Sequence, residues 1–181
     1  MHEKKIYKIL KDWFPQLADR EIPAKKRLGK FKHFLWFMKA ERSGKRIRSY
    51  ILKIDYNAYW DNGLEYCSVL QDTNIETNPI QTKIRNQVLP IIEHYEKYKD
   101  VIGRYYNLNE QINDIVIREL YSVTQHCEYE MLLICAEHYY WMLVPSDDKK
   151  IGKFCKKFNE QFKDESVTVE HYVLGECLSS T

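Results

Sequence analysis

The chain has 181 residues, of which 44% are hydrophobic and 30% are charged. It is long enough to bury a core and short enough to favour one domain over residues 1–181. No apolar run approaches the roughly 18 residues that a membrane span needs, and the N-terminus MHEKKIYKIL has lysines where a signal peptide would be apolar. We therefore expect a cytoplasmic protein with no membrane-embedded part.

The formal net charge of +2 conceals a division along the chain. Residues 1–50 contain 15 Lys and Arg against 5 Asp and Glu, a net charge of +10, whereas residues 51–181 contain 13 against 21, a net charge of −8. A basic N-terminal part can meet nucleic acid, an acidic protein or the chain's own acidic part. The sequence leaves these three possibilities open.

The N-terminal end is predicted to be an amphipathic helix. Residues 2–14 carry apolar side chains at helical spacing, and Pro15 ends the pattern. A basic connection, residues 20–30, follows. The helix side chains expected to face the core are Ile6, Ile9, Leu10 and Trp13.

A three-stranded antiparallel meander is predicted next. Residues 31–41 fit a helical stripe about as well as a buried strand. We assign them to a strand because a turn at Ser43-Gly44 leads into residues 50–56, which alternate at period two. A second turn, at Asn62-Gly63, leads to the third strand, residues 64–70.

Two helices are predicted in the middle of the chain. After a polar loop, residues 71–78, a long helical pattern begins at Pro79 and continues to about Gly103, with a kink expected at Pro90. A further helix is predicted over residues 109–121, with Ile112, Ile115, Val116 and Leu120 on its apolar face.

The C-terminal third is predicted to contain a strand pair, a helix and a last strand. Residues 128–136 and 138–144 are too apolar for an exposed surface and indicate paired, buried strands that stop at Pro145. Ser146 can cap the helix that follows, and a β-rich run, residues 166–173, can add a strand. The apolar stripe of the helix consists of Ile151, Phe154, Cys155, Phe158 and Phe162. These elements together predict a single α+β domain, with an antiparallel sheet made of the N-terminal meander and the C-terminal hairpin, and flanking helices.

Catalytic motifs and metal-ligand spacings are not evident in the sequence. His126 and Cys127 lie at one end of a predicted strand while Cys135 and His138 lie at the other, so the four are not expected to converge on a zinc ion. We expect no catalytic residue, no metal and no cofactor, although an enzyme of unrecognised type stays open.

A basic segment interleaved with aromatic residues is the first candidate site. Cations can follow a phosphate backbone while aromatic rings stack on bases, which is typical of a surface that binds single-stranded nucleic acid. The other interpretation is a charged sheet edge whose aromatics, Phe31, Phe34, Trp36 and Phe37, face the core. The cations are Lys25, Lys26, Arg27, Lys30, Lys32, Arg42, Lys45, Arg46 and Arg48.

Aromatic residues beside acidic ones are the second candidate site, for a protein partner. Tyr and Trp are enriched where proteins bind proteins, because they bury a large area with few rotatable bonds. The alternative is that these aromatics belong to the core. The candidate residues, which lie in and beside two predicted loops, are Tyr56, Tyr59, Trp60, Asp61, Asp72 and Glu76.

Residues 139–162, YYWMLVPSDDKKIGKFCKKFNEQF, resemble the C-terminal strand and helix of small bacterial immunity proteins of polymorphic or contact-dependent toxin systems. The matching pattern is an aromatic strand, then Pro-Ser-Asp-Asp, then a helix with Phe-Cys and Phe at helical spacing. The resemblance implies a non-enzymatic cytoplasmic protein that binds one toxin domain tightly and blocks it. It carries over no binding residue, and the basic residues 1–50 depart from the acidic character frequent among partners of nuclease toxins.

The sequence therefore leaves two alternative functions, which belong to different classes. The first is a binding protein that neutralises a cognate toxin domain by tight protein–protein binding. The alternative is a nucleic-acid-binding or processing protein that uses residues 25–48.

Overall fold

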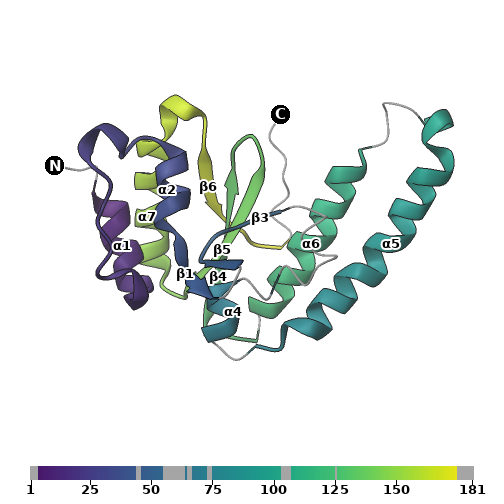
Figure 1. Cartoon of the computed structure of the whole chain (residues 1–181), viewed down its shortest axis with the longest axis horizontal. Helices are drawn as coiled ribbons and strands as arrows, with labels where there is room; N and C mark the ends of the chain where they lie inside the picture. The colour runs from purple at the N-terminus through teal and green to yellow at the C-terminus, as the bar shows by residue number, and fades with distance from the viewer. Residues whose placement is uncertain are drawn as a thin grey trace.

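The computed structural model of the chain describes residues 4–43, 46–54, 64, 67–72, 75–102, 107–124 and 126–174; for residues 40–43 and 46–48 it describes the backbone alone. Within these ranges it contains six α-helices and six β-strands, with helices on both sides of an antiparallel sheet (Figure 1). The predicted α+β fold class is therefore confirmed.

The central sheet has four antiparallel strands in the order β3–β5–β4–β6. The predicted C-terminal hairpin is confirmed as β4 (Tyr129–Cys135) and β5 (Tyr139–Pro145). The predicted last strand is confirmed as β6 (Thr168–His171), which pairs with β4. A strand of two residues, β3 (Leu52–Lys53), pairs with the other side of β5.

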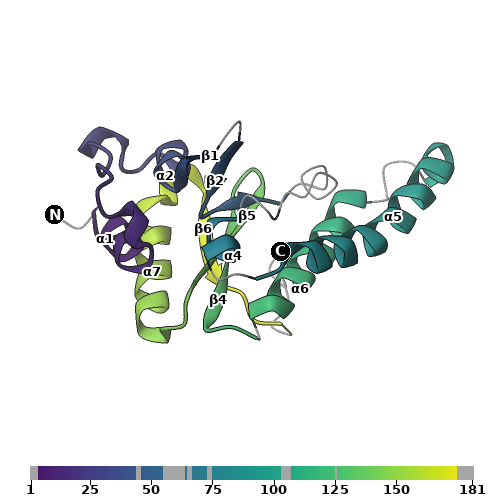
Figure 2. The same cartoon turned by 60° about the horizontal axis from the view of Figure 1, so that its bottom comes forward.

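Helices cover both faces of this sheet (Figures 1 and 2). One layer consists of α1 (Lys5–Trp13), α2 (Phe31–Phe37) and α7 (Asp148–Gln161). On the other face lies α6 (Leu108–Thr124), and α5 (Thr77–Ile102) lies on the outer side of α6. Because both faces are covered, residues 131–134 and 141–144 are buried without alternation.

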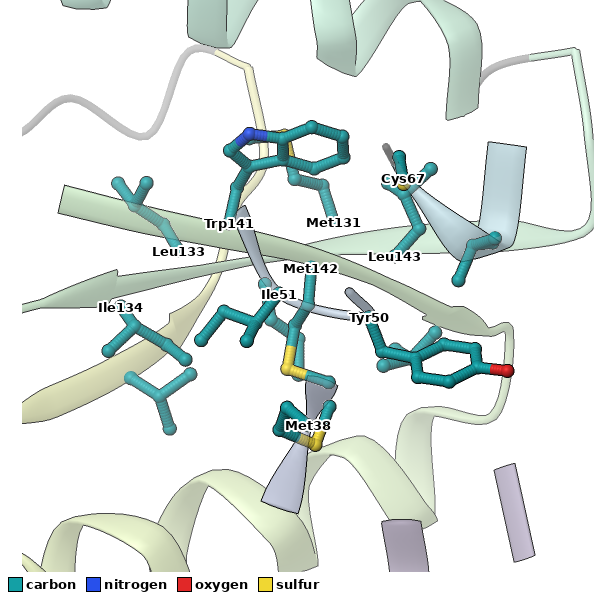
Figure 3. Close-up of a cluster of buried hydrophobic side chains, with 14 of the residues drawn as sticks. Met38, Tyr50, Ile51, Cys67, Met131, Leu133, Ile134, Trp141, Met142 and Leu143 are labelled. Carbon is teal, nitrogen blue, oxygen red and sulfur yellow. The ribbon is translucent and has the colours of Figure 1, made fainter. Parts of the chain in front are cut away.

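The two faces of the hairpin carry different parts of the core (Figure 3). Trp141 pairs with Leu133, and their side chains lie on the face that α6 covers. Met142 lies on the opposite face beside Met38, toward α7 and α1. In that layer Phe158 of α7 packs edge-on against Phe34 of α2, with ring centroids 5.1 Å apart.

Four predicted helices are confirmed, and one predicted cap is corrected. The confirmed helices are α1, α5, α6 and α7, and α5 continues through Pro90. The N-cap of α7 is Asp147, whose side-chain oxygen accepts the Lys150 N–H at 2.9 Å. The Ser146 hydroxyl instead donates to Glu130, 3.2 Å away.

The predicted N-terminal meander is wrong. Residues 31–37 form helix α2, and the strand begins only at β1 (Lys39–Ser43), which pairs with β2 (Arg46–Ser49) in a separate two-stranded sheet. A helix places Phe31, Phe34 and Phe37 on one buried face, where Phe31 and Phe34 pack against Phe158 of α7 and Phe37 packs against Tyr7 of α1.

The expected third strand, residues 64–70, is also corrected. Its second half belongs to helix α4 (Ser68–Asp72), whose Val69 and Leu70 are buried in the core. Residues Gly44, Asn62 and Gly63 of the two expected turns lie outside the described residues.

Candidate interaction surfaces

Most of the residues predicted to bind a protein partner lie outside the described part of the chain. These are Tyr56, Tyr59, Trp60 and Asp61. Asp72, at the end of α4, is exposed and accepts a hydrogen bond of 3.4 Å from the side chain of Gln16. Glu76 is exposed just before α5. Asp72 is thereby connected to the short 3₁₀ helix η1 (Pro15–Leu17) that follows α1.

The basic segment, residues 25–48, is distributed over several elements. Lys25, Lys26 and Arg27 form a 3₁₀ helix, η2, and are exposed; Lys30 and Lys32 are exposed at the start of α2. Arg42 lies in β1, whereas Arg46 and Arg48 lie in β2. Lys45 lies outside the described residues.

The aromatic residues of this segment do not lie on one face of the protein. Phe31, Phe34 and Phe37 are buried in the core on the inner face of α2, so the interpretation in which they stack on bases is wrong. Trp36 points the other way, with 61% of the residue exposed. The helical period explains the difference, since Trp36 is out of phase with the three phenylalanines.

Glu165 joins the basic segment to the acidic part of the chain. One of its oxygens accepts the Phe31 backbone N–H at 2.6 Å, and the other lies 3.1 Å from the Lys30 ammonium group. The hydrogen bond from Phe31, followed by the interactions with Lys30 and the charge of Lys32, lowers the pKa of Glu165. Of the three possible partners of the basic part, the chain's own acidic part is thus contacted here.

A cavity of about 370 Å³ lies between η2 and the C-terminal end of α7. Gln161 lines this cavity, and its side-chain amide donates to the carbonyl of Leu28 at 2.7 Å. Lys157 is paired with Glu160 at 2.6 Å. The lining thus mixes both charges: Lys25, Leu28, Gly29, Lys157, Glu160, Gln161 and Asp164.

A second surface, which we name the tyrosine–carboxylate surface, lies on the α6 side of the sheet. It consists of Tyr139, Tyr172, Glu110, Asp114 and Glu170. Glu110 and Asp114 are exposed one turn apart on α6, Glu170 is exposed on β6, and Tyr139 begins β5 with 39% of the residue exposed. The half-buried Tyr172 packs edge-on against Tyr121, with ring centroids 5.3 Å apart.

Electrostatic coupling shows that these side chains share one environment. Partial burial, followed by Cys135, raises the pKa of Tyr139, and the charges of the three carboxylates raise it further. Burial also raises the pKa of Tyr172, with Asp114 the next cause. Burial and the charge of Glu110 raise the pKa of Asp114 itself. The carboxylates thus disfavour a further negative charge on Tyr139, while the charge of Arg118 acts the other way on the pKa values of Asp114 and Tyr172.

The sequence contains only partial signals for this surface. Glu110 and Asp114 have the spacing of neighbours on a helix, and Glu170 and Tyr172 alternate along a strand. The strand order brings Tyr139 near β6, because Cys135 of β4 is paired with Tyr139 on one side and with Thr168 of β6 on the other. Glu110 and Asp114 join them because α6 covers this face of the sheet.

The described cysteines are in environments that disfavour thiolate chemistry. Burial raises the pKa of Cys67 to about 12 and that of Cys155 to about 11. The Cys127 thiol donates to the carbonyl of Val123 at 3.0 Å. In the described ranges, no three His, Cys, Asp or Glu side chains are grouped so that they could hold a metal ion.

Comparisons with known proteins give no assignment. None of the protein-family models, curated proteins or solved structures compared with the chain matches it. Among the described residues, no helix combines the length and the apolar character needed to cross a bilayer. Function is therefore argued from the two surfaces.

Proposed function

We propose that the protein binds a cognate toxin domain and neutralises it, with the tyrosine–carboxylate surface as the docking face. The observation that carries the proposal is the position of Tyr139, an exposed aromatic residue whose pKa is raised by burial and by the charges of groups that include Glu110, Asp114 and Glu170. Tyrosine gives contact area at a small cost in rotamer entropy, and the carboxylates give charge complementarity to a basic partner.

The elements beneath this surface support its role as a preformed interface. Tyr139 is continuous with the fully buried residues 141–144 of β5, and α6 is anchored by Ile112 and Val116, both completely buried. A side chain held on rigid elements loses less entropy when a partner binds. The surface therefore suits tight binding without rearrangement of the backbone.

Its negative charge indicates the chemistry of the partner. Carboxylates around an aromatic residue attract lysine and arginine and accelerate encounter with a basic surface. We expect the toxin domain to present cationic side chains around or beside its active site, so that the bound protein blocks access of the substrate. Inhibition then requires no chemical step on this chain.

The test begins with affinity purification of the tagged protein from its source organism, followed by an activity assay of the co-purified partner. We expect one stoichiometric protein partner whose activity is lost in the complex. A partner that stays fully active would exclude inhibition. Nucleic acid that is removed by salt, with no protein partner, would exclude the proposed function altogether.

Two variants locate the interface. Tyr139→Ala and Asp114→Lys should each weaken binding about ten-fold or more, as loss of an interface anchor or reversal of a contacting charge does. Asp19→Lys is the matched control, because Asp19 is exposed just after η1, which follows α1 in the chain, and α1 belongs to the helical layer on the other face of the sheet. Equal affinities for Asp114→Lys and Asp19→Lys would show that the toxin docks elsewhere.

A further inference from the structure

Trp36 is the most exposed aromatic residue in the described part of the chain, with 61% of its surface open. The phenylalanines of the same helix, Phe31, Phe34 and Phe37, are buried. Helix α2 is thus anchored by its inner face and presents a single indole outward. The tyrosine–carboxylate surface, on the other side of the sheet, does not include it.

Both ends of α2 are fixed by side chains from other elements. At its start, Glu165 accepts the Phe31 N–H, a contact between residues 134 positions apart. At its end, the Arg20 guanidinium donates to the carbonyls of Trp36 and Phe37. The helix backbone below the indole is therefore held in place, and little order has to be gained when a ligand stacks on it.

The stretch of chain that contains Trp36 is strongly cationic. Residues 25–39 contain six Lys and Arg and no Asp or Glu. Lys32 lies one helical turn before Trp36, and Lys39 follows the helix; both are exposed. Glu165 pairs with Lys30, while Lys25 and Lys26 are exposed on η2. The chain then continues into β1 and β2, which contain Arg42, Arg46 and Arg48.

We propose that this surface, formed by Trp36 with Lys25, Lys26, Lys32 and Lys39, binds single-stranded nucleic acid. A base stacks on the indole, and the lysines contact the phosphates on either side of that base. A single strand is required, because the face of a paired base is covered by its neighbours in the duplex. An acidic protein would engage the lysines, but its carboxylates would gain nothing from the flat indole.

The experiment measures fluorescence anisotropy of a labelled oligothymidine about 15 nucleotides long, titrated with the full chain at several salt concentrations. Trp36→Ala should weaken binding between about five-fold and a hundred-fold, the range that loss of one base–aromatic stack produces, and Trp36→Phe should retain most of the affinity. Lys32→Gln should lower the slope of log affinity against log salt by about 0.7, the value for one phosphate contact in a single strand.

Val101→Ala is the control, because Val101 is 86% exposed on α5 and contributes no charge or ring. Thermal unfolding of each variant verifies that it folds. We expect the Trp36 variants to fold, because this side chain is exposed and contributes little to the core. Absence of binding by the wild-type chain at low salt would overturn the proposal. Binding that Trp36→Ala leaves unchanged would also overturn it. If, in that case, polyglutamate displaces the labelled oligothymidine as well as unlabelled oligothymidine does, the surface binds an acidic protein instead. These outcomes are independent of toxin binding.

Discussion

Glu119 is a carboxylate that the packing of α5 against α6 encloses, leaving 5% of the residue exposed. The Lys83 ammonium group lies 2.6 Å from one oxygen, and the Gln87 amide donates to the other at 2.7 Å. Burial alone would raise the pKa of Glu119, but the hydrogen bonds and the charge of Lys83 outweigh it, so the pKa is lowered. Glu119 thus adds charged contacts between the two helices, beside the hydrogen bond of 2.7 Å that Arg118 donates to Gln87.

Replacement of Glu119 should therefore destabilise the protein. Glu119→Ala should lower the free energy of unfolding by about 2 kcal/mol, because the half-buried Gln87 amide loses its carboxylate acceptor and the exposed Lys83 ammonium group loses its ion pair. Urea denaturation measures the change. Glu96→Ala is the matched control: Glu96 also pairs with a lysine of α5, Lys99, but on the exposed side of the helix. Its effect should stay within about 0.5 kcal/mol, and equal losses for the two variants would contradict this role of Glu119.

Helix α7 gives a test at the scale of one element, because its cap involves two adjacent candidates. Asp147→Ala should lower the free energy of unfolding by about 1 kcal/mol, since its oxygen is the acceptor for the Lys150 N–H in the first turn. Ser146→Ala should have the smaller effect, because that hydroxyl bonds to Glu130 on the sheet. Thermal or urea unfolding ranks the two variants, and the reverse order would assign the cap to Ser146.

Elements with one unambiguous pattern were predictable from the sequence. The apolar faces of α1 and α7, and the continuous apolar runs of β4 and β5, each fit a single structure. Residues 31–37 fit two, because their aromatic residues suit a buried strand as well as a helix. The choice depends on α7, which is more than a hundred residues away. Helix α4 was misassigned in the same way, since a short apolar run has no period of its own.

The tyrosine–carboxylate surface could not be predicted, although its residues are ordinary. Tyr139, Asp114 and Glu170 come from three elements: the strand order β5–β4–β6 brings Tyr139 near Glu170, and the packing of α6 on the sheet adds Asp114. Lys25, Lys26, Lys30 and Lys32 of the predicted basic segment are exposed, but the sequence could not separate Trp36 from the phenylalanines beside it. Only the helical period of α2 places Trp36 on the face opposite to the phenylalanines, and a strand assignment of these residues does not.

For the whole molecule, the lowered pKa values of Glu119 and Glu165 make stability depend on acid. Below pH 4.5, the ordinary pKa of glutamate, these two side chains bind protons in the unfolded chain but stay ionised in the folded protein until a lower pH. Their stabilisation is therefore complete above that pH and is lost as the pH falls through their lowered values. Asp114, whose pKa is raised, acts in the opposite direction.

This prediction is tested by urea unfolding between pH 7 and about pH 3. The wild-type chain should lose stability more steeply below pH 4.5 than a Glu119→Gln, Glu165→Gln double variant, because the amides do not titrate. Asp114 is present in both proteins, so its effect cancels in the comparison. Parallel curves for the two proteins would show that neither carboxylate contributes to acid sensitivity.

The contacts between the N-terminal helices and α7 constrain how the chain matures during translation. Glu165 and Gln161 contact residues that the ribosome adds 134 and 133 positions earlier, and Phe154 of α7 packs against Trp13 of α1. The aromatic faces of α1 and α2 therefore cannot pack against α7 until most of the polypeptide has been synthesised. A prematurely terminated product that ends before α7 would display these rings to chaperones and proteases, so we expect it to be degraded rather than to accumulate.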